Sequence, residues 1–306
     1  MNAAAISRLS RALLVLLAVS FLTFIIGHES GDPVMLLARG DATAVQKQDL
    51  RHSLGLDRPV MAQYGTYLRN ALHGDLGESY RQHLPVTRLI ALRLPASLGL
   101  ATTAFVLAMS LALLSGLLCV IYRHSMLDKA VAGLAVLSQV VPGFWLGLIL
   151  VLIFAVHLGL LPVSGAGDFE HLILPAITLA LPTFGRMSRM IRAGILDALN
   201  SDYIRTARAK GLPERDVLLH HALKNALLPL ITQAGLELGD MVGNAFIIEI
   251  VFAWPGIGRM TVESIQQRDF LVAQGCVLII GTGFVLINLA VDLVYAAIDP
   301  RVRARR

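Results

Sequence analysis

Cysteine and lysine are both scarce in this chain of 306 residues. The two cysteines, Cys119 and Cys276, both fall in apolar runs, so the sequence offers neither a disulfide framework nor the paired spacing of a zinc site. None of the four lysines follows a glycine or precedes Ser or Thr, so the chain has no phosphate-binding P-loop. Any nucleotide hydrolysis on which this protein depends must therefore take place on another chain.

Charged residues are also few. They make up 15% of the chain against 56% hydrophobic residues, and the mean hydropathy is +0.68, which is far from the balance of a soluble domain. About 20 helical residues cross the hydrocarbon core of a bilayer. Apolar runs of about that length occur at 10–27, 97–121, 130–158, 172–191, 226–251 and 272–298. We therefore expect an all-α integral membrane protein with six transmembrane helices.

Lysine and arginine in the short loops predict the orientation, because positive charge is retained on the cytoplasmic side. Loop 122–129 holds Arg123 and Lys129, whereas loop 159–171 holds neither residue type. Both termini are therefore expected in the cytoplasm. The net charge of +5 then belongs to the inner surface of the protein and does not indicate binding of nucleic acid.

These runs predict three parts of the chain. Residues 1–96 hold the first transmembrane helix and an external segment, which is expected to form a small insert of short helices before the second span. Residues 97–298 form a five-helix core that contains a polar cytoplasmic loop at 197–225. Residues 299–306 form a basic cytoplasmic tail.

The stretch from Tyr203 to Pro213 is rich in cations and lies between two long apolar runs. Residues 202–210 suit a helix, Gly211 suits the left-handed position that ends one, and Pro213 can start the next. Isolated helices below about 12 residues are marginal in water. The short helix therefore needs a surface to pack on, either a partner protein or its own bundle, and the residues alone favour neither.

The same loop resembles the cytoplasmic coupling loop of bacterial ABC-importer permeases, the EAA loop. The matching residues are Arg205-Thr206-Ala207, then Gly211, then His221-Ala222-Leu223-Lys224. Arg205 stands where that motif has an acidic residue and Lys224 where it has proline, as in the dipeptide, oligopeptide and nickel permease subfamily. Further motifs, such as Gly74-Asp75-Leu76-Gly77 and Trp254-Pro255-Gly256, extend the resemblance over nearly the whole chain.

This resemblance implies a type I ABC importer permease fold in the bacterial inner membrane. It implies three kinds of partner: a second homologous permease subunit, two cytoplasmic ABC ATPase subunits and an external substrate-binding protein. ATP and Mg would be held by the ATPases, and this chain would be non-catalytic, with no cofactor or metal of its own. The residues expected to couple it to the ATPase are Tyr203, Arg205, Thr206, Ala207, Arg208, Lys210, Gly211 and Leu212.

The fifth run carries a polar stripe. At about 100° per residue, Gln233, Glu237, Asp240 and Asn244 share one narrow face of a helix. Ionisable side chains in a bilayer normally face a partner or a water-filled cavity. We expect this stripe to approach the translocation path; the alternative is that the acids only bond to neighbouring helices.

A second face of the same run is lined by glycine. Gly235, Gly239 and Gly243 are spaced four apart, which permits close approach of another helix. In the last run, Asn288 and Asp292 share a face, and because the resemblance includes this pattern, it implies a role in helix packing for them.

Arg186, Arg189 and Arg192 lie towards the cytoplasmic end of the fourth run. Arginine inside a membrane is costly, so these side chains are expected to snorkel to the inner surface. Pro142 and Pro182 are expected to bend the third and fourth spans.

Substrate and energy source leave three hypotheses open. The resemblance favours an ATP-driven importer of di- or oligopeptides, with nickel or a metal–chelate complex as the alternative cargo. The nine histidines show no metal-ligand cluster. A proton-coupled secondary transporter is the rival of another class, because membrane carboxylates can relay protons. An intramembrane aspartyl protease would need Gly-x-Gly-Asp, and Glu237-Leu238-Gly239-Asp240 lacks the first glycine.

Overall fold

The computed structural model describes residues 3–29, 34 and 43–298, and within them the chain is helical, with one isolated bridge between Glu78 and Pro85 as its only β pairing. The predicted tail 299–306 lies outside the described residues. The chain divides into two compact units, which are described separately. Unit 1 comprises Met1–Ala96 with Pro255–Val285, and unit 2 comprises Ser97–Trp254 with Leu286–Arg306. Residues 255–285, which are far along the chain, thus belong to the same unit as the N-terminal segment.

Unit 1 is built around an apolar core formed by residues from both of its chain segments. Its helices are α1 (Ala3–Glu29), α3 (Ala44–Ser53), α4 (Val60–Leu72), the first turns of α5 (Val86–Ile121), α12 (Ile257–Gln266) and the first part of α13 (Phe270–Ile298). The core residues are Leu76, Val86, Leu89, Ile90, Ile257, Met260, Val272 and Cys276. A Cβ on Gly275 would lie 2.6 Å from Val86, so glycine allows α13 and α5 to approach closely here.

The external segment forms the expected short helices. Thr43 caps α3 by accepting from the Gln46 amide, and the Gln46 side chain accepts from the Thr43 amide in return. The buried Asp269 carboxylate holds the loop before α5, because it accepts from the Ser79 hydroxyl at 2.5 Å and from the Tyr80 amide at 3.3 Å. The predicted small helical insert is confirmed.

Unit 2 is organised by α8 (Phe169–Leu199), which packs against α6 (Met126–Val140), α7 (Gly143–Leu150) and α11 (Lys224–Val251). The rest of α5 joins them, and π-helical segments η1 (Val151–His157) and η2 (Val217–Leu223) extend α7 and precede α11. Fully buried apolar side chains fill the space between these helices. They include Leu100, Leu174, Met187, Ile191, Ile195 and Phe252.

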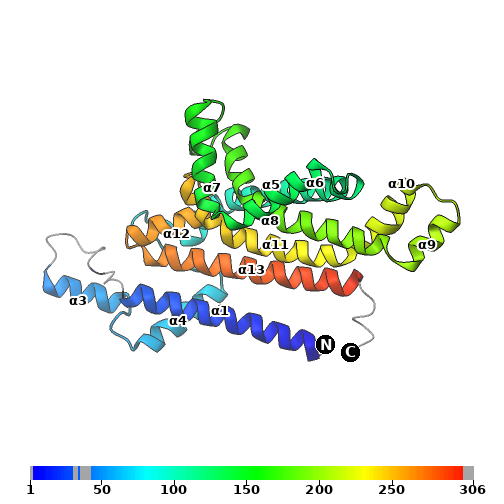
Figure 1. The fold of residues 1–306 in the computed structure, drawn as a ribbon. Helices are drawn as coiled ribbons and strands as arrows, with labels where there is room; N and C mark the ends of the chain where they lie inside the picture. Colours follow the sequence, from blue (N-terminus) through cyan, green and yellow to red (C-terminus); the bar gives the residue numbers. More distant parts are fainter. Residues whose placement is uncertain (1–2, 30–33, 35–42, 299–306) are drawn as a thin grey trace. The chain divides into compact units, whose positions relative to one another are not determined.

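The third predicted span is not one straight helix. It breaks at Val141 and Pro142, and the two halves, α6 and α7 with η1, meet at 113°. Figure 1 shows α7 standing away from the direction of α6. Pro142 removes a backbone donor and fixes its own φ, so the helix stops and restarts there. The expected bend at Pro142 is therefore confirmed, and it is a full break between two helices.

By length and composition alone, two described helices can cross a membrane, Val86–Ile121 and Phe270–Val291, or three if the bent pair counts as one span. The apolar part of α1, Leu13–Glu29, is slightly short by this measure. α8 and α11 are long enough, but both carry arginine or carboxylate side chains within the predicted spans. These polar side chains of α8 and α11 form part of the candidate site.

Candidate coupling loop and translocation site

The polar loop in unit 2 forms a helix that ends as its residues predict. α9 runs from Asp202 to Ala209, and Gly211 follows with φ +81°. The Gly211 amide donates to the Arg208 carbonyl and the Leu212 amide to the Ala207 carbonyl, which is the Schellman pattern of a left-handed helix end. At the other end, the Ser201 hydroxyl donates to the Ala198 carbonyl and does not cap α9.

α9 has one buried and one exposed face. Ile204 and Ala207 are 0% and 5% exposed and belong to the apolar core of unit 2. Ala207, predicted as a coupling residue, therefore holds α9 to its own bundle. The other seven candidates are exposed: Tyr203, Arg205, Thr206, Arg208, Lys210, Gly211 and Leu212. One face of the short helix thus packs on its own bundle, and the other face is open.

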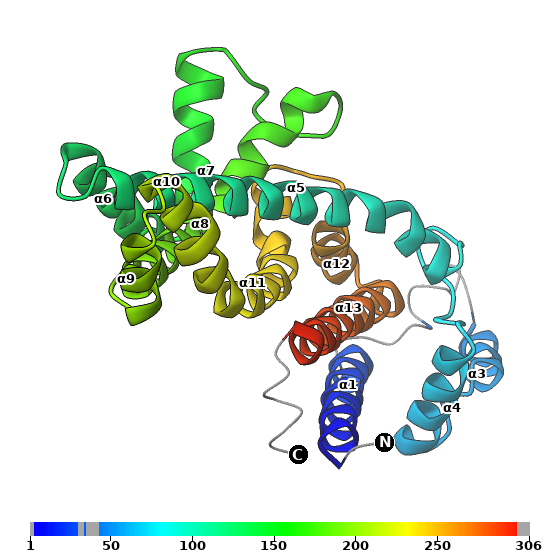
Figure 2. The same cartoon turned by 90° about the vertical axis from the view of Figure 1, so that its right-hand side faces the viewer.

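The helix after the loop continues directly into α11. Pro213 precedes α10 (Glu214–Asp216), and η2 and α11 follow without a break. α9 and α8 both pack against η2, through which the buried Val217 and Ala222 enter the core. Figures 1 and 2 show α9 and α10 side by side at one end of α8 and α11. α9 therefore packs against a helical segment that runs on into α11.

An ion pair fixes the turn between α9 and α10. Arg208 donates from Nε to one carboxylate oxygen of Glu214 at 2.6 Å and from a terminal nitrogen to the other at 3.2 Å. Both side chains are largely exposed to solvent. This hydrogen bonding holds the pKa of Glu214 below its usual value.

The Arg208–Glu214 ion pair should persist through neutral pH. A depressed carboxyl pKa contributes stability above its unfolded value, which is about 4.3, and loses it as the pH falls through the folded value. Hydrogen exchange of segment 208–214 should be slower in the wild type than in Glu214→Gln from about pH 5 to 8, and the difference should begin to shrink only as the pH falls below about 4.3. Convergence already near about pH 6 would contradict this assignment.

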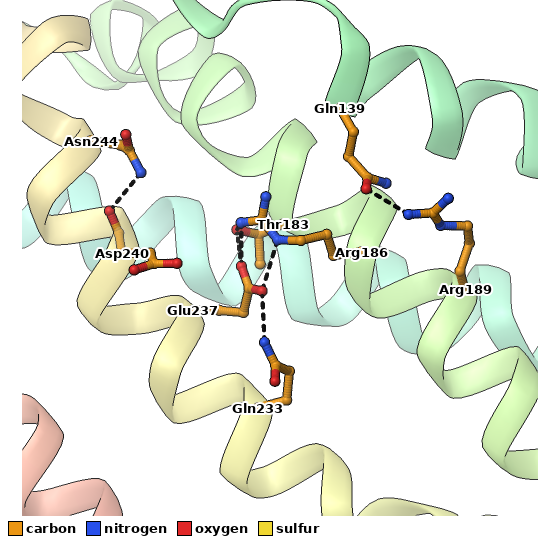
Figure 3. A network of polar contacts seen from close by, with 8 residues as sticks. All are labelled: Gln139, Thr183, Arg186, Arg189, Gln233, Glu237, Asp240 and Asn244. Atoms are coloured by element: carbon orange, nitrogen blue, oxygen red, sulfur yellow. Dashed lines mark hydrogen bonds and ion pairs between the residues drawn. The ribbon is translucent and has the colours of Figure 1, made fainter.

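A buried network joins α8 to α11. Glu237 is 1% exposed and accepts from Arg186 Nε at 2.8 Å, from the Thr183 hydroxyl at 2.9 Å and from the Gln233 amide at 3.2 Å (Figure 3). A second bond from Arg186 makes the pair bidentate. A buried carboxylate requires such partners, because leaving water is costly for a charge.

The other two arginines of α8 are also engaged. Arg189 donates to the Gln139 side chain, and Arg192 donates to both oxygens of the buried Asp128 at 2.8 and 2.9 Å. Each of the three arginines thus has a side-chain acceptor on α6 or α11. Their spacing of three residues puts them on neighbouring turns of one helix, where they bond α8 to two different helices.

A cavity of about 360 Å³ lies between α6, α7, α8 and α11. Asp240 and Asn244 of the predicted polar stripe line it, together with Thr183, Arg186 and Gln139. Glu237 instead lies behind Arg186, and Gln233 is bonded to it. The structure thus brings two of the four translocation candidates to the cavity and places the other two in the network beside it.

The glycine face of α11 makes one close helix contact. A Cβ on Gly235 would lie 2.3 Å from a methyl group of Val291 on α13, so only glycine allows this approach. Gly239 is buried, whereas a Cβ on Gly243 would meet no described atom within 4 Å. Asn288 is half-buried on α13, and the side chain of Asp292 lies outside the described structure.

Sequence reasoning missed the partners of this site. Thr183, Arg186, Gln139 and Asp128 were not among its candidates, although the three arginines in an otherwise apolar run were a visible signal. The acceptors on α6 and α11 are about 50 residues or more away in sequence, so only the fold could reveal them.

A polar cavity between the helices and an exposed helix–turn that leads into one of them fit the class of transport permeases. The chain belongs to the family of binding-protein-dependent transport system inner membrane components. The family model of that description matches residues 109–304, and the model for the N-terminal part of such membrane components matches residues 1–101. Its relatives include the glutathione transport system permease protein GsiC of Escherichia coli K12 and of Shigella flexneri. Each is 40% identical over 299 residues, which cover 97% of this chain and 98% of the relative.

Solved structures share the fold. The MetNI methionine ABC transporter matches 69% of this chain and 96% of its own, with a TM-score of 0.59 and 18% identity. An amino acid ABC transporter with histidines matches with a TM-score of 0.55 and 16% identity, over 69% of this chain and 94% of its own. The chain is therefore an inner-membrane permease subunit of an ABC importer, of the peptide-type subfamily. This excludes a proton-coupled secondary transporter and an intramembrane protease as its class.

Proposed function

We propose that this chain and a second homologous permease subunit together form the path for short peptides that an external binding protein delivers. Two ATPase subunits, which hold ATP and Mg, bind the exposed face of α9 and drive the cycle. In this arrangement the chain itself performs no chemistry, and both of its termini lie in the cytoplasm.

The structure of the polar loop is the observation that supports coupling most directly. Seven of its eight candidate residues are exposed, on a helix too short to be stable alone or directly after it, while Ile204 and Ala207 anchor that helix to the core of unit 2. The chain has no P-loop, so energy has to enter through a surface of this kind. The cations Arg205 and Lys210 on this surface also agree with a cytoplasmic location.

A peptide substrate is favoured by the relatives and by the cavity. GsiC is a permease for glutathione, which is a tripeptide, and it aligns with nearly the full length of this chain. The cavity between α6, α7, α8 and α11 falls within the range of small-ligand pockets, about 300–1,000 Å³. No group of three or more His, Cys, Asp or Glu side chains in the described ranges could hold a metal ion. The described residues therefore offer no binding site for a bare nickel ion.

Uptake by the reconstituted transporter tests this proposal. Vesicles that contain this chain, its permease partner, both ATPases and the binding protein should accumulate glutathione and trialanine when ATP is supplied inside. An ATPase variant without its P-loop lysine should show no uptake, and a proton gradient without ATP should drive none. Failure of both peptides to accumulate, with nickel accumulating instead, would contradict the proposed substrate class.

A further inference from the structure

The polar groups in the cavity between α6, α7, α8 and α11 differ in whether they already have a partner. Arg186 is occupied by Glu237 through both carboxylate oxygens. Gln139 accepts from Arg189 and donates to the Ala135 carbonyl. Thr183 donates to Glu237. Each of these side chains thus already has a hydrogen-bond partner within the protein.

Asp240 is different. It is exposed on the face of α11 that borders the cavity, and Figure 3 shows its carboxylate on the α8 side of the helix. The Asn244 amide bonds to the backbone carbonyl of Asp240, and the carboxylate itself interacts with the Arg186 guanidinium through charge alone. Within the described part of the chain, no side chain forms a hydrogen bond or ion pair with that carboxylate.

The charges of the cavity wall do not cancel. Arg186 is balanced by Glu237 behind it, which leaves one negative charge, that of Asp240. Arg189 is the next cation along α8, but it is turned to Gln139 and is absent from the described lining of the cavity. A ligand with a single positive group would complete this arrangement.

The remainder of the wall strengthens that preference. Phe144, Met241, Ile247 and Ile248 line the cavity and provide an apolar surface. Charge interactions are stronger beside such low-dielectric walls than in open water, and unpaired ionisable groups within a membrane mark substrate pathways. A group that is strongly hydrated when free, such as an ammonium, needs a fixed counter-charge to enter here.

We propose that Asp240 binds the α-ammonium group of the peptide as it passes through the membrane, and so selects peptides with a free amino terminus. This inference rests on the proposed peptide function and adds the group on the protein that recognises the substrate. Asn244 lies one turn further along α11 and lines the same cavity. Its side-chain oxygen can accept a hydrogen bond from the ammonium group held by Asp240.

Direct binding of two matched peptides tests this role. The complex of this chain, its permease partner and the ATPases, without the binding protein, is placed in lipid nanodiscs and titrated with trialanine and with N-acetyl-trialanine. Leaving out the binding protein removes its own selection from the measurement. Two variants change Asp240: Asp240→Asn removes only the charge, and Asp240→Glu keeps it. The matched control is Asp197→Asn, because Asp197 is an exposed residue of α8 that does not line the cavity.

The expected result is a loss specific to one peptide. Asp240→Asn should bind trialanine about tenfold more weakly than the wild type, as for the loss of one hydrogen bond to a charged group, and should bind N-acetyl-trialanine unchanged. Asp240→Glu and Asp197→Asn should bind both peptides nearly as the wild type does. Equal losses for the two peptides, or no loss in Asp240→Asn, would overturn the role of Asp240.

The two proposals fail in different ways. If the complete wild-type transporter takes up trialanine but Asp240→Asn binds it normally, only the inference about Asp240 is wrong. If the wild type takes up neither trialanine nor glutathione, the proposed substrate class is wrong, and the role of Asp240 is wrong with it.

Discussion

Replacement of Gly211 by valine is expected to separate ATP hydrolysis from transport. Gly211 has φ +81°, a conformation that costs other L-residues about 1–2 kcal/mol and is worse for a β-branched residue. Since about 1.4 kcal/mol is a tenfold change in an equilibrium, the equilibrium should shift about tenfold away from the Schellman end of α9. ATP-driven uptake in vesicles should fall at least about tenfold, while the ATPases continue to hydrolyse ATP.

Gly211→Asn is the matched control, because asparagine tolerates the left-handed region far better than valine does. A Cβ at position 211 would meet no atom within 4 Å, so steric overlap cannot explain a difference between the two variants. Normal, fully coupled uptake by Gly211→Val would refute the proposed mechanical role of this turn.

Loss of the Glu237 carboxylate is expected to have the largest effect on stability. Glu237→Ala leaves Arg186 without its carboxylate and leaves the hydroxyl of Thr183 and the amide of Gln233 without an acceptor. Removal of one member of a buried ion pair typically costs about 3–5 kcal/mol. The Arg186 side chain is 39% exposed, so the lower end of that range, about 3 kcal/mol, is expected here. The measurement is the thermal inactivation midpoint of the purified transporter.

Two further variants make this prediction specific. Arg186→Met combined with Glu237→Leu should recover much of the loss, because both charges are then removed together. Asp240→Ala lies one turn along the same helix at an exposed position, and it should leave the midpoint nearly unchanged. A midpoint for Glu237→Ala equal to that of Asp240→Ala would show that the Arg186–Glu237 pair does not hold α8 to α11.

Local signals in the sequence were sufficient to predict where the helices of the coupling loop end and begin. Gly211 and Pro213 carry their own backbone preferences, so the end of α9 and the start of α10 followed from residue type alone. Tyr203 and Arg205 were correctly expected at a surface. The burial of Ala207 was not foreseen, because the 3.6-residue period of so short a helix does not say which face meets the bundle.

The polar network was predicted only in part, for a different physical reason. The 100° periodicity placed Glu237 and Asp240 on one stripe of α11, but it could not separate a carboxylate that has an arginine partner from one that faces a cavity. That distinction depends on Arg186, which lies 51 residues earlier in sequence. Pro142 likewise predicted a bend, while the angle of 113° depends on the packing of α7 against α8 and α11.

The most direct test of the account is cysteine cross-linking between α9 and the ATPase in the assembled transporter. Cys119 and Cys276 are buried, at 1% and 0% exposure, and give little background. Tyr203→Cys and Arg205→Cys lie on the exposed face of α9, and Ala207→Cys on its buried face is the control. The account predicts cross-links to the ATPase from positions 203 and 205 and none from 207. Cross-links from none of the three positions, in a transporter that still takes up peptide, would contradict it.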